Sequence, residues 1–209
     1  NDFPFQNTVQ IGQPKVRQQN NFLKKTDIQQ FNRLIINAKN VLKTAAWHQS
    51  AFRQIPPTMT ESATDTWQVD RSNRVVASWE HRPNRHSGWQ ARVAWLDEFI
   101  AFYYAADTDT SRARTFLGSF EYSASQGRHL FWKIGANGAF QSAQADGYAD
   151  SSRWFQQPKS ATFGMAEWQW RNGKVSVLTR QEVVDQAFMP MTWSLGGQIK
   201  FGKPGEGLF

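Results

Sequence analysis

From Thr66 onward, apolar side chains recur at every second position, and this period of two constrains the fold more than any other feature of the chain. In the run from Trp89 to Trp95 the odd positions are all apolar, whereas Gln90 and Arg92 lie between them. Such alternation is typical of a half-buried strand, because successive side chains of a strand point to opposite faces. The sequence therefore predicts strands, and not helices, for most of the chain.

The alternating segments come in pairs. Residues 75–79 and 89–95 flank the turn residues 83–88, which predicts a hairpin. Residues 116–122 and 130–134 are separated by a break at Ser125-Gln126-Gly127, and we expect these two segments to be neighbours as well.

A third hairpin is predicted from Asn172-Gly173, the dipeptide favoured by a two-residue turn with positive φ at both positions. That turn would pair Trp168 with Val177. A last strand is expected at Thr192–Phe201, with a bulge or bend at Gly196-Gly197. With further segments at 99–104 and 139–143, the pattern predicts roughly eight to ten short strands joined by short turns.

Upstream of these strands the apolar spacing changes. Apolar residues recur at steps of three and one, at Ile28, Phe31, Leu34, Ile35, Ala38, Val41, Leu42 and Ala45. This spacing predicts an amphipathic helix over residues 27–50. Thr26 and Gln29 form a capping-box pattern at its start, and Pro56-Pro57 would end any extension.

Together these patterns predict a mainly β fold. We expect an antiparallel meander that forms a barrel or a strongly curved sheet, with the one N-terminal amphipathic helix packed on it. The expected organisation is a polar arm at 1–25, a single β-rich domain at 26–201 that includes the helix, and a tail at 202–209. Closure of the sheet is left open, since alternation identifies neighbouring strands but not closure.

The positive charge is concentrated in the first 60 residues. The chain has 24 Lys and Arg against 17 Asp and Glu, but its first 60 residues have eight against two. This asymmetry favours an anionic macromolecule or a protein as a partner of this segment. The candidate basic surface consists of Lys24, Lys25, Arg33, Lys39 and Lys43, and a solvated helix face is the alternative.

Ten tryptophans are the most unusual feature of the composition. Each buried indole N–H needs a partner, so a plain core is a costly use of this residue. A ligand-lined interior, an exposed stacking surface and a plain core remain open. The candidate ligand-binding residues are Trp79, Trp89, Trp95, Trp132, Trp168, Trp170 and His48, the last of which could present its imidazole to a planar, haem-like ligand.

Catalytic and metal chemistry find little support in the sequence. Glu80, Glu121 and Glu167 could serve a glycan-active hydrolase, but alternation places Glu80 and Glu121 opposite the neighbouring aromatic residues, as expected of outward-facing charges. The chain has no cysteine, no nucleophile elbow, no phosphate-binding loop and no metal-ligand spacing. We therefore predict no catalytic residues and no metal, and no cofactor can be named.

The leading hypothesis is an exported, non-enzymatic binding protein. It would hold an apolar or planar ligand in an aromatic-lined barrel, or dock a partner through its basic N-terminal segment. A single-stranded nucleic-acid binding module and a glycan-active hydrolase are the alternatives. Since the sequence starts at Asn1, we expect a removed signal peptide and a periplasmic or secreted bacterial protein. The longest apolar run, at 99–106, is far too short for a membrane-spanning helix, so no transmembrane segment is expected.

Overall fold

The computed structural model describes residues 4–5, 12, 15–17, 20–57, 65–104, 107–148 and 150–199. Within these residues the chain forms strands and turns and no helix. The strands are β1 (Pro4–Phe5), β2 (Val16–Arg17), β3 (Leu23–Asn37), β4 (Asn40–Ile55), β5 (Thr66–His81), β6 (Ser87–Tyr104), β7 (Asp107–Gln126), β8 (Leu130–Ala145), β9 (Phe155–Trp170), β10 (Gly173–Val184), β11 (Ala187–Phe188) and β12 (Thr192–Ile199).

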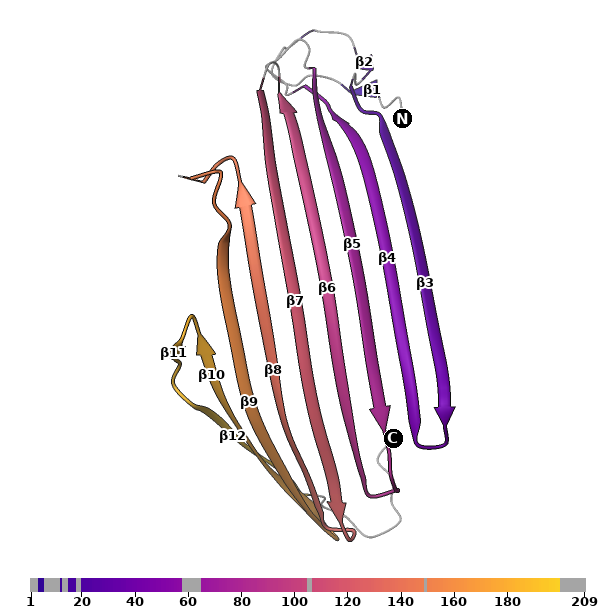
Figure 1. The fold of residues 1–209 in the computed structure, drawn as a ribbon, viewed down its shortest axis with the longest axis vertical. Helices are drawn as coiled ribbons and strands as arrows, with labels where there is room; N and C mark the ends of the chain where they lie inside the picture. Colours follow the sequence, from indigo (N-terminus) through magenta and orange to yellow (C-terminus); the bar gives the residue numbers. More distant parts are fainter. Residues whose placement is uncertain are drawn as a thin grey trace.

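Strands β3 to β12 form one antiparallel sheet, and β1 pairs with β2 in a small separate one. Each strand from β3 to β10 pairs with the next along the chain, and both β11 and β12 pair with β10. Figure 1 shows the long strands side by side in a single layer, with the short turns after β3, β5, β7 and β9 at one end. We call this end the turn end.

The predicted meander is thus confirmed, but the predicted helix at 27–50 is wrong. These residues form most of β3 and β4, which pair from Leu23 with Arg53 to Asn37 with Asn40. Because the apolar residues are spaced by three and by one, they occupy both odd and even positions, and in the hairpin they lie on both faces of the sheet. In this segment β-branched residues and the pairing of β4 with β5 outweigh the helical spacing, since tertiary pairing overrides local propensity.

The turn between β3 and β4 has a local cause. The Asn37 side-chain oxygen accepts hydrogen bonds from the backbone N–H of Lys39, at 2.9 Å, and from the Asn40 side-chain amide, at 2.9 Å. Asparagine side chains commonly close turns in this way. This turn lies at the centre of the segment in which a helix is expected from the sequence.

The sheet is not closed. Its two edges are β3 on one side and β11 with β12 on the other, and no other described element packs on either face. Burial is correspondingly sparse: among the described residues, those classed as buried include Ala51, Ala101, Ala161, Thr66 and Asp97. The predicted barrel is not formed by these strands, and the predicted N-terminal helix does not cover them. The predicted tail at 202–209 lies outside the described residues.

The strands are longer than the sequence predicts. The β5–β6 and β7–β8 hairpins are confirmed, but the segment at 99–104 is part of β6, and the segment at 139–143 is part of β8. These four strands are 16 to 20 residues long.

The predicted register of the β9–β10 hairpin is wrong by two residues. Trp170 pairs with Gly173 and Trp168 with Val175, so Trp168 does not pair with Val177. A Cβ on Gly173 would lie 2.7 Å from the Trp170 ring, so this glycine permits close approach of the ring. Positive φ occurs instead in the turn before β11, at Asp185 (49°) and Gln186 (69°). The predicted bulge at Gly196-Gly197 is also absent, because β12 pairs with β10 without a register shift.

Candidate functional site

The two faces of the sheet differ in chemistry. Side chains of directly paired residues lie on the same face, so the registers assign every strand residue to a face. We call the side that carries Trp89 and Trp95 of β6 the aromatic face, and the side that carries Gln90 and Arg92 the polar face. Trp79 belongs to the aromatic face, because it pairs with Ala91.

The aromatic face carries a continuous band of apolar side chains across the centre of the sheet. We call it the apolar belt, and in β5 to β8 its members are Val75, Ala77, Trp79, Trp89, Ala91, Val93, Trp95, Phe116, Gly118, Phe120, Tyr122, Leu130, Trp132, Ile134, Ala136, Gly138 and Phe140. The belt continues through Trp168, Ala166 and Gly164 of β9 and Val175 and Val177 of β10. No Asp, Glu, Lys or Arg of these described strands lies within it.

The height of the belt differs between strands, and at about 3.4 Å per residue its segment from Val75 to Trp79 in β5 spans about 14 Å. The belt runs from Trp89 to Trp95 in β6 and from Leu130 to Phe140 in β8. At a rise of about 3.4 Å per residue, these segments span about 20 Å and about 34 Å. Many of its side chains are unprotected by other parts of the sheet: Phe116 is 52% exposed and Trp168 53% exposed.

Aromatic rings border the belt at the turn end of the sheet. Trp79 and Trp89 meet edge to face with their ring centroids 4.1 Å apart, and Trp89 lies 6.0 Å from Phe120. Tyr122 and Trp132 follow with centroids 5.3 Å apart. At the opposite border, Trp95 and Phe116 are direct partners, and Phe116 pairs with Phe140. Both borders of the belt are therefore aromatic, and smaller side chains lie between them.

The polar face carries charges at the same level. Lys43 donates to Glu80, whose pKa is held below its usual value chiefly by this hydrogen bond. Lys133 lies 3.0 Å from Glu121, and Lys174 lies 3.1 Å from Glu167. Each of the three glutamates considered for hydrolysis is therefore paired with a lysine, on the face opposite the six candidate tryptophans.

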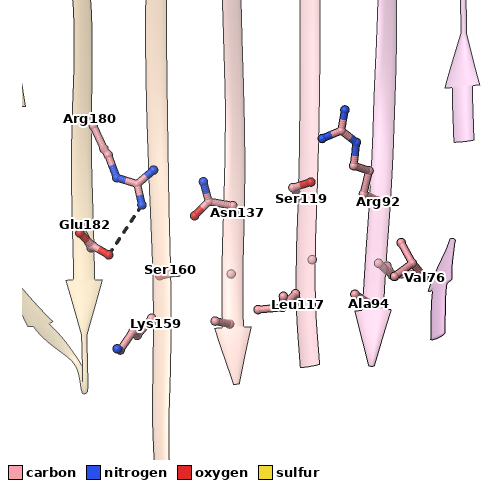
Figure 2. Close-up of a pocket in the computed structure, with 14 residues that line it drawn as sticks. Val76, Arg92, Ala94, Leu117, Ser119, Asn137, Lys159, Ser160, Arg180 and Glu182 are labelled. Atoms are coloured by element: carbon pink, nitrogen blue, oxygen red, sulfur yellow. Dashed lines mark ion pairs between the residues drawn. The ribbon is translucent and has the colours of Figure 1, made fainter. Parts of the chain in front are cut away.

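A shallow depression of about 450 Å³ lies at the centre of the polar face. Figure 2 shows its charged residues: Arg92, Lys159, Arg180 and Glu182, with an ion pair between Arg180 and Glu182 at 3.6 Å. Small residues of β6 to β8 form its floor. The surface is hollow because these side chains are short, and three cations and one carboxylate are among the residues that line it.

Immediately beyond the belt, away from the turn end, the aromatic face becomes charged. Asp97, which is only 7% exposed, receives two hydrogen bonds from the Arg112 guanidinium, at 2.9 and 3.0 Å. Arg114 adds a third, at 3.1 Å. The bond from Arg112 is the main cause that lowers the pKa of Asp97 below its ordinary value, and Asp97 in turn raises the pKa of Arg112.

The structure brings together the six candidate tryptophans, but not around an interior. Trp79, Trp89, Trp95, Trp132, Trp168 and Trp170 all lie on the aromatic face. His48 shares this face, but it lies beyond the belt, where its Nδ1 is 2.7 Å from the Asn73 side-chain oxygen.

The five candidate basic residues do not form one surface. Lys24 lies on the aromatic face, whereas Lys25, Arg33 and Lys43 lie on the polar face and Lys39 is in the turn. Lys25 is 2.9 Å from Asp27, and Lys43 is paired with Glu80. The predicted surface depends on the helix at 27–50, which the structure replaces by strands.

Sequence reasoning missed the pattern of charge around the belt, including Arg71, Arg112 and Arg114. The available signal was that the charged residues of the alternating segments 75–81 and 87–95, Glu80 and Arg92, occupy even positions, opposite Trp79, Trp89 and Trp95. Among the described residues, no helix is long and apolar enough to cross a membrane. No group of three or more metal-ligating side chains occurs among them either. No family model matches the chain, and no match to a curated protein was found.

Proposed function

We propose that this sheet is a membrane-embedded wall, whose aromatic face lies against the hydrocarbon of a bilayer and whose polar face lies against water. One observation carries the proposal: the apolar belt is free of charge on one face, while ion pairs occupy the other face at the same level. Membrane strands alternate in this way, because only the face in contact with lipid must be apolar.

The exposure of the belt supports this assignment. A contiguous apolar surface of this extent is uncommon on a protein surrounded by water, where exposed apolar patches rarely exceed several hundred Å². Val93 lies in its middle and is 47% exposed. Contact with acyl chains would remove this surface from water over strands β5 to β10 at once.

The aromatic borders support it as well. Trp and Tyr are enriched where hydrocarbon meets the lipid headgroups, since their rings are apolar and their N–H or O–H groups can reach polar partners. Trp89 and Tyr122 would lie at one such boundary and Trp95 at the other. The apolar band of membrane strands is about 25 Å tall, which lies between the heights of the belt in β6 and in β8.

Backbone hydrogen bonding sets a further requirement. Inside the sheet each long strand is paired on both sides, so its backbone groups have partners in the absence of water. The free backbone groups of edge strands β3 and β12 would need strand partners wherever they enter hydrocarbon. The proposal therefore includes pairing of both edges within the membrane.

This proposal revises the ligand-binding hypothesis and keeps its central feature, an aromatic surface that binds an apolar partner. The expectation of no transmembrane segment rests on the length of unbroken apolar runs, and a crossing strand needs only alternate apolar residues. Nucleic-acid stacking is less favoured, because at the level of the belt the aromatic rings and the cations lie on opposite faces. A periplasmic or secreted location remains a prediction, and the proposal favours a membrane reached by export.

Quenching by brominated lipid tests the proposal. The full chain is folded with phosphatidylcholine vesicles whose acyl chains carry bromine, a contact quencher of indole fluorescence. Two variants report on opposite faces: one retains Trp95 and the other retains Trp47, which pairs with Arg74 on the polar face, and all other tryptophans are Phe in both. We expect strong quenching of Trp95 and weak quenching of Trp47.

Flotation of the wild-type chain with the same vesicles, before and after alkaline carbonate, provides the control for integration. A chain that stays at the bottom of the gradient, or two indoles quenched equally, would overturn the proposal. If both Phe-rich variants fail to fold, bromine quenching of the single variants Trp95→Phe and Trp47→Phe, each measured against the wild-type chain, compares the two faces.

A further inference from the structure

We infer that Arg71, Arg112 and Arg114 form a binding site for the phosphate groups of lipid headgroups, at the border of the apolar belt away from the turn end. This inference rests on the proposed membrane location, because it places the three guanidinium groups at the depth of the headgroups. It adds a partner of defined chemistry to an otherwise non-specific apolar surface.

The registers place the three arginines close together on the aromatic face. Arg71 pairs with Phe99, and Phe99 pairs with Arg112, so the two arginines flank one phenylalanine on successive strands. Their Cα atoms are about 10 Å apart, which is twice the spacing of neighbouring strands. Arg114 is two residues nearer to the belt on β7, and it pairs with Asp97. The long side chains can therefore reach a common ligand.

The charge of this cluster is not balanced by the protein. Asp97 is the one carboxylate on the aromatic face of described strands β4 to β8, and it serves both Arg112 and Arg114. Within the described residues, Arg71 has no carboxylate at ion-pair distance. Three guanidinium groups and one carboxylate leave a net charge of two. Two neighbouring cations of the polar face are, by contrast, each paired with a carboxylate. Arg53 contacts Asp70 at 2.6 Å, and Arg74 contacts Glu98 at 2.8 Å.

Aromatic rings hold the guanidinium groups in place. The Arg71 Cζ lies 6.0 Å from the centroid of the Phe99 ring, and Phe99 lies between Arg71 and Arg112 in the sheet. The Arg114 Cζ lies 4.8 Å from the centroid of the Trp154 ring. Arg112 is fixed by its two bonds to Asp97, which use only two of its three nitrogens. Ordering these groups before binding reduces the entropy lost when an anion arrives.

The geometry favours phosphate over other anionic groups of lipids. A planar guanidinium presents paired N–H groups that match two oxygens of one phosphate, and arginine is the usual residue at such sites. A headgroup phosphate is attached to acyl chains, so one lipid can contact the arginines and the belt simultaneously. Inorganic phosphate lacks the second contact.

Native mass spectrometry of the full chain in non-ionic detergent micelles tests the inference. Short-chain phosphatidylglycerol, short-chain phosphatidylcholine and inorganic phosphate are titrated separately. We expect phosphatidylglycerol adducts at the lowest concentration and weak binding of inorganic phosphate. In the double variant Arg71→Gln/Arg114→Gln the affinity for phosphatidylglycerol should fall about twentyfold, and the remaining affinity should depend less on salt.

The matched control is Arg92→Gln/Lys159→Gln, which removes the same charge from the polar face and should leave lipid binding unchanged. Arg112 is retained in both variants so that Asp97 keeps its bidentate partner. Equal loss in both double variants would show a net-charge effect and overturn the site, as would an affinity for inorganic phosphate equal to that for phosphatidylglycerol. Detergent covers the belt in every sample, so lipid adducts in the mass spectra report on the phosphate site alone. The membrane proposal is tested separately, by flotation of the chain with vesicles.

Discussion

Val93 and Val76 lie on adjacent strands at nearly the same height, 47% and 41% exposed, but on opposite faces of the sheet. Val93 pairs with Ala77 and faces the side of Trp89 and Trp95, whereas Val76 pairs with Ala94 and borders the depression on the polar face. The two valines therefore have the same chemistry and similar exposure. They differ in their proposed surroundings, which are hydrocarbon for Val93 and water for Val76.

Lysine at these two positions should have different effects. Val93→Lys would place an ammonium group in the middle of the belt, which costs about 2–4 kcal/mol for a strand in a bilayer. Val76→Lys would face water and should cost less than about 1 kcal/mol. The measurement is the fraction of protein that floats with phosphatidylcholine vesicles across a urea series. Equal losses for the two variants would argue against lipid contact on the aromatic face.

Gly135 should tolerate no side chain. A Cβ at this position would lie 2.4 Å from the Phe163 ring and 2.7 Å from the backbone oxygen of Phe120. Since the backbone oxygen cannot move aside as a side chain can, Gly135→Ala should destabilise the sheet by about 1–3 kcal/mol. Gly118→Ala is the control, because a Cβ there meets nothing within 4 Å. Denaturant midpoints of the two variants provide the comparison, and equal midpoints would contradict it.

Acid should weaken the contact of Asp97 with Arg112. Because its pKa is lowered in the folded chain, Asp97 contributes its full stabilisation above its ordinary pKa of 3.8 and loses it as the pH falls below that value. Asp97→Asn should cost about 1–3 kcal/mol at neutral pH. The variant should also show a smaller loss of stability than the wild type between pH 5 and pH 3. A variant with the same pH profile as the wild type would rule out this role.

The ion pairs of the polar face should contribute little to stability. Lys133 and Glu121 are both partly exposed, so water screens their attraction. A double-mutant cycle with Lys133→Met and Glu121→Gln should give a coupling free energy of about 0.2–1 kcal/mol. The measurement is the free energy of unfolding of the four proteins. A coupling above 2 kcal/mol would indicate that this face is shielded from water, contrary to the proposed arrangement.

Much of the sheet could be predicted from local patterns. The alternation around Trp89 and the turn residues at 83–88 predict the β5–β6 hairpin, and the same reasoning predicts β7 and β8. Alternation also predicts that Glu80 lies opposite Trp79, as the structure confirms. These predictions succeed because a period of two is a property of the strand itself and needs no knowledge of its neighbours.

The hairpin of β3 and β4 shows where local patterns are insufficient. The spacing of Ile28, Phe31 and Leu34 fits a helix, but Phe31 pairs with Ala45 on one face and Leu34 pairs with Leu42 on the other. The choice between helix and strands depends on β5, which supplies a complete hydrogen-bonding partner for β4. No window within residues 27–50 contains that information.

The sequence by itself determined the alternation, and therefore which residues of one strand share a face. Only the tertiary structure decided that the faces of successive strands coincide, because the pairing registers bring the tryptophans of four separate strands to one side. It also placed Arg71 of β5 beside Arg112 of β7, 41 positions later in the chain. The physical reason is that a one-residue change in register would move every side chain of a strand to the other face, and register is set by the partner strands and the turns.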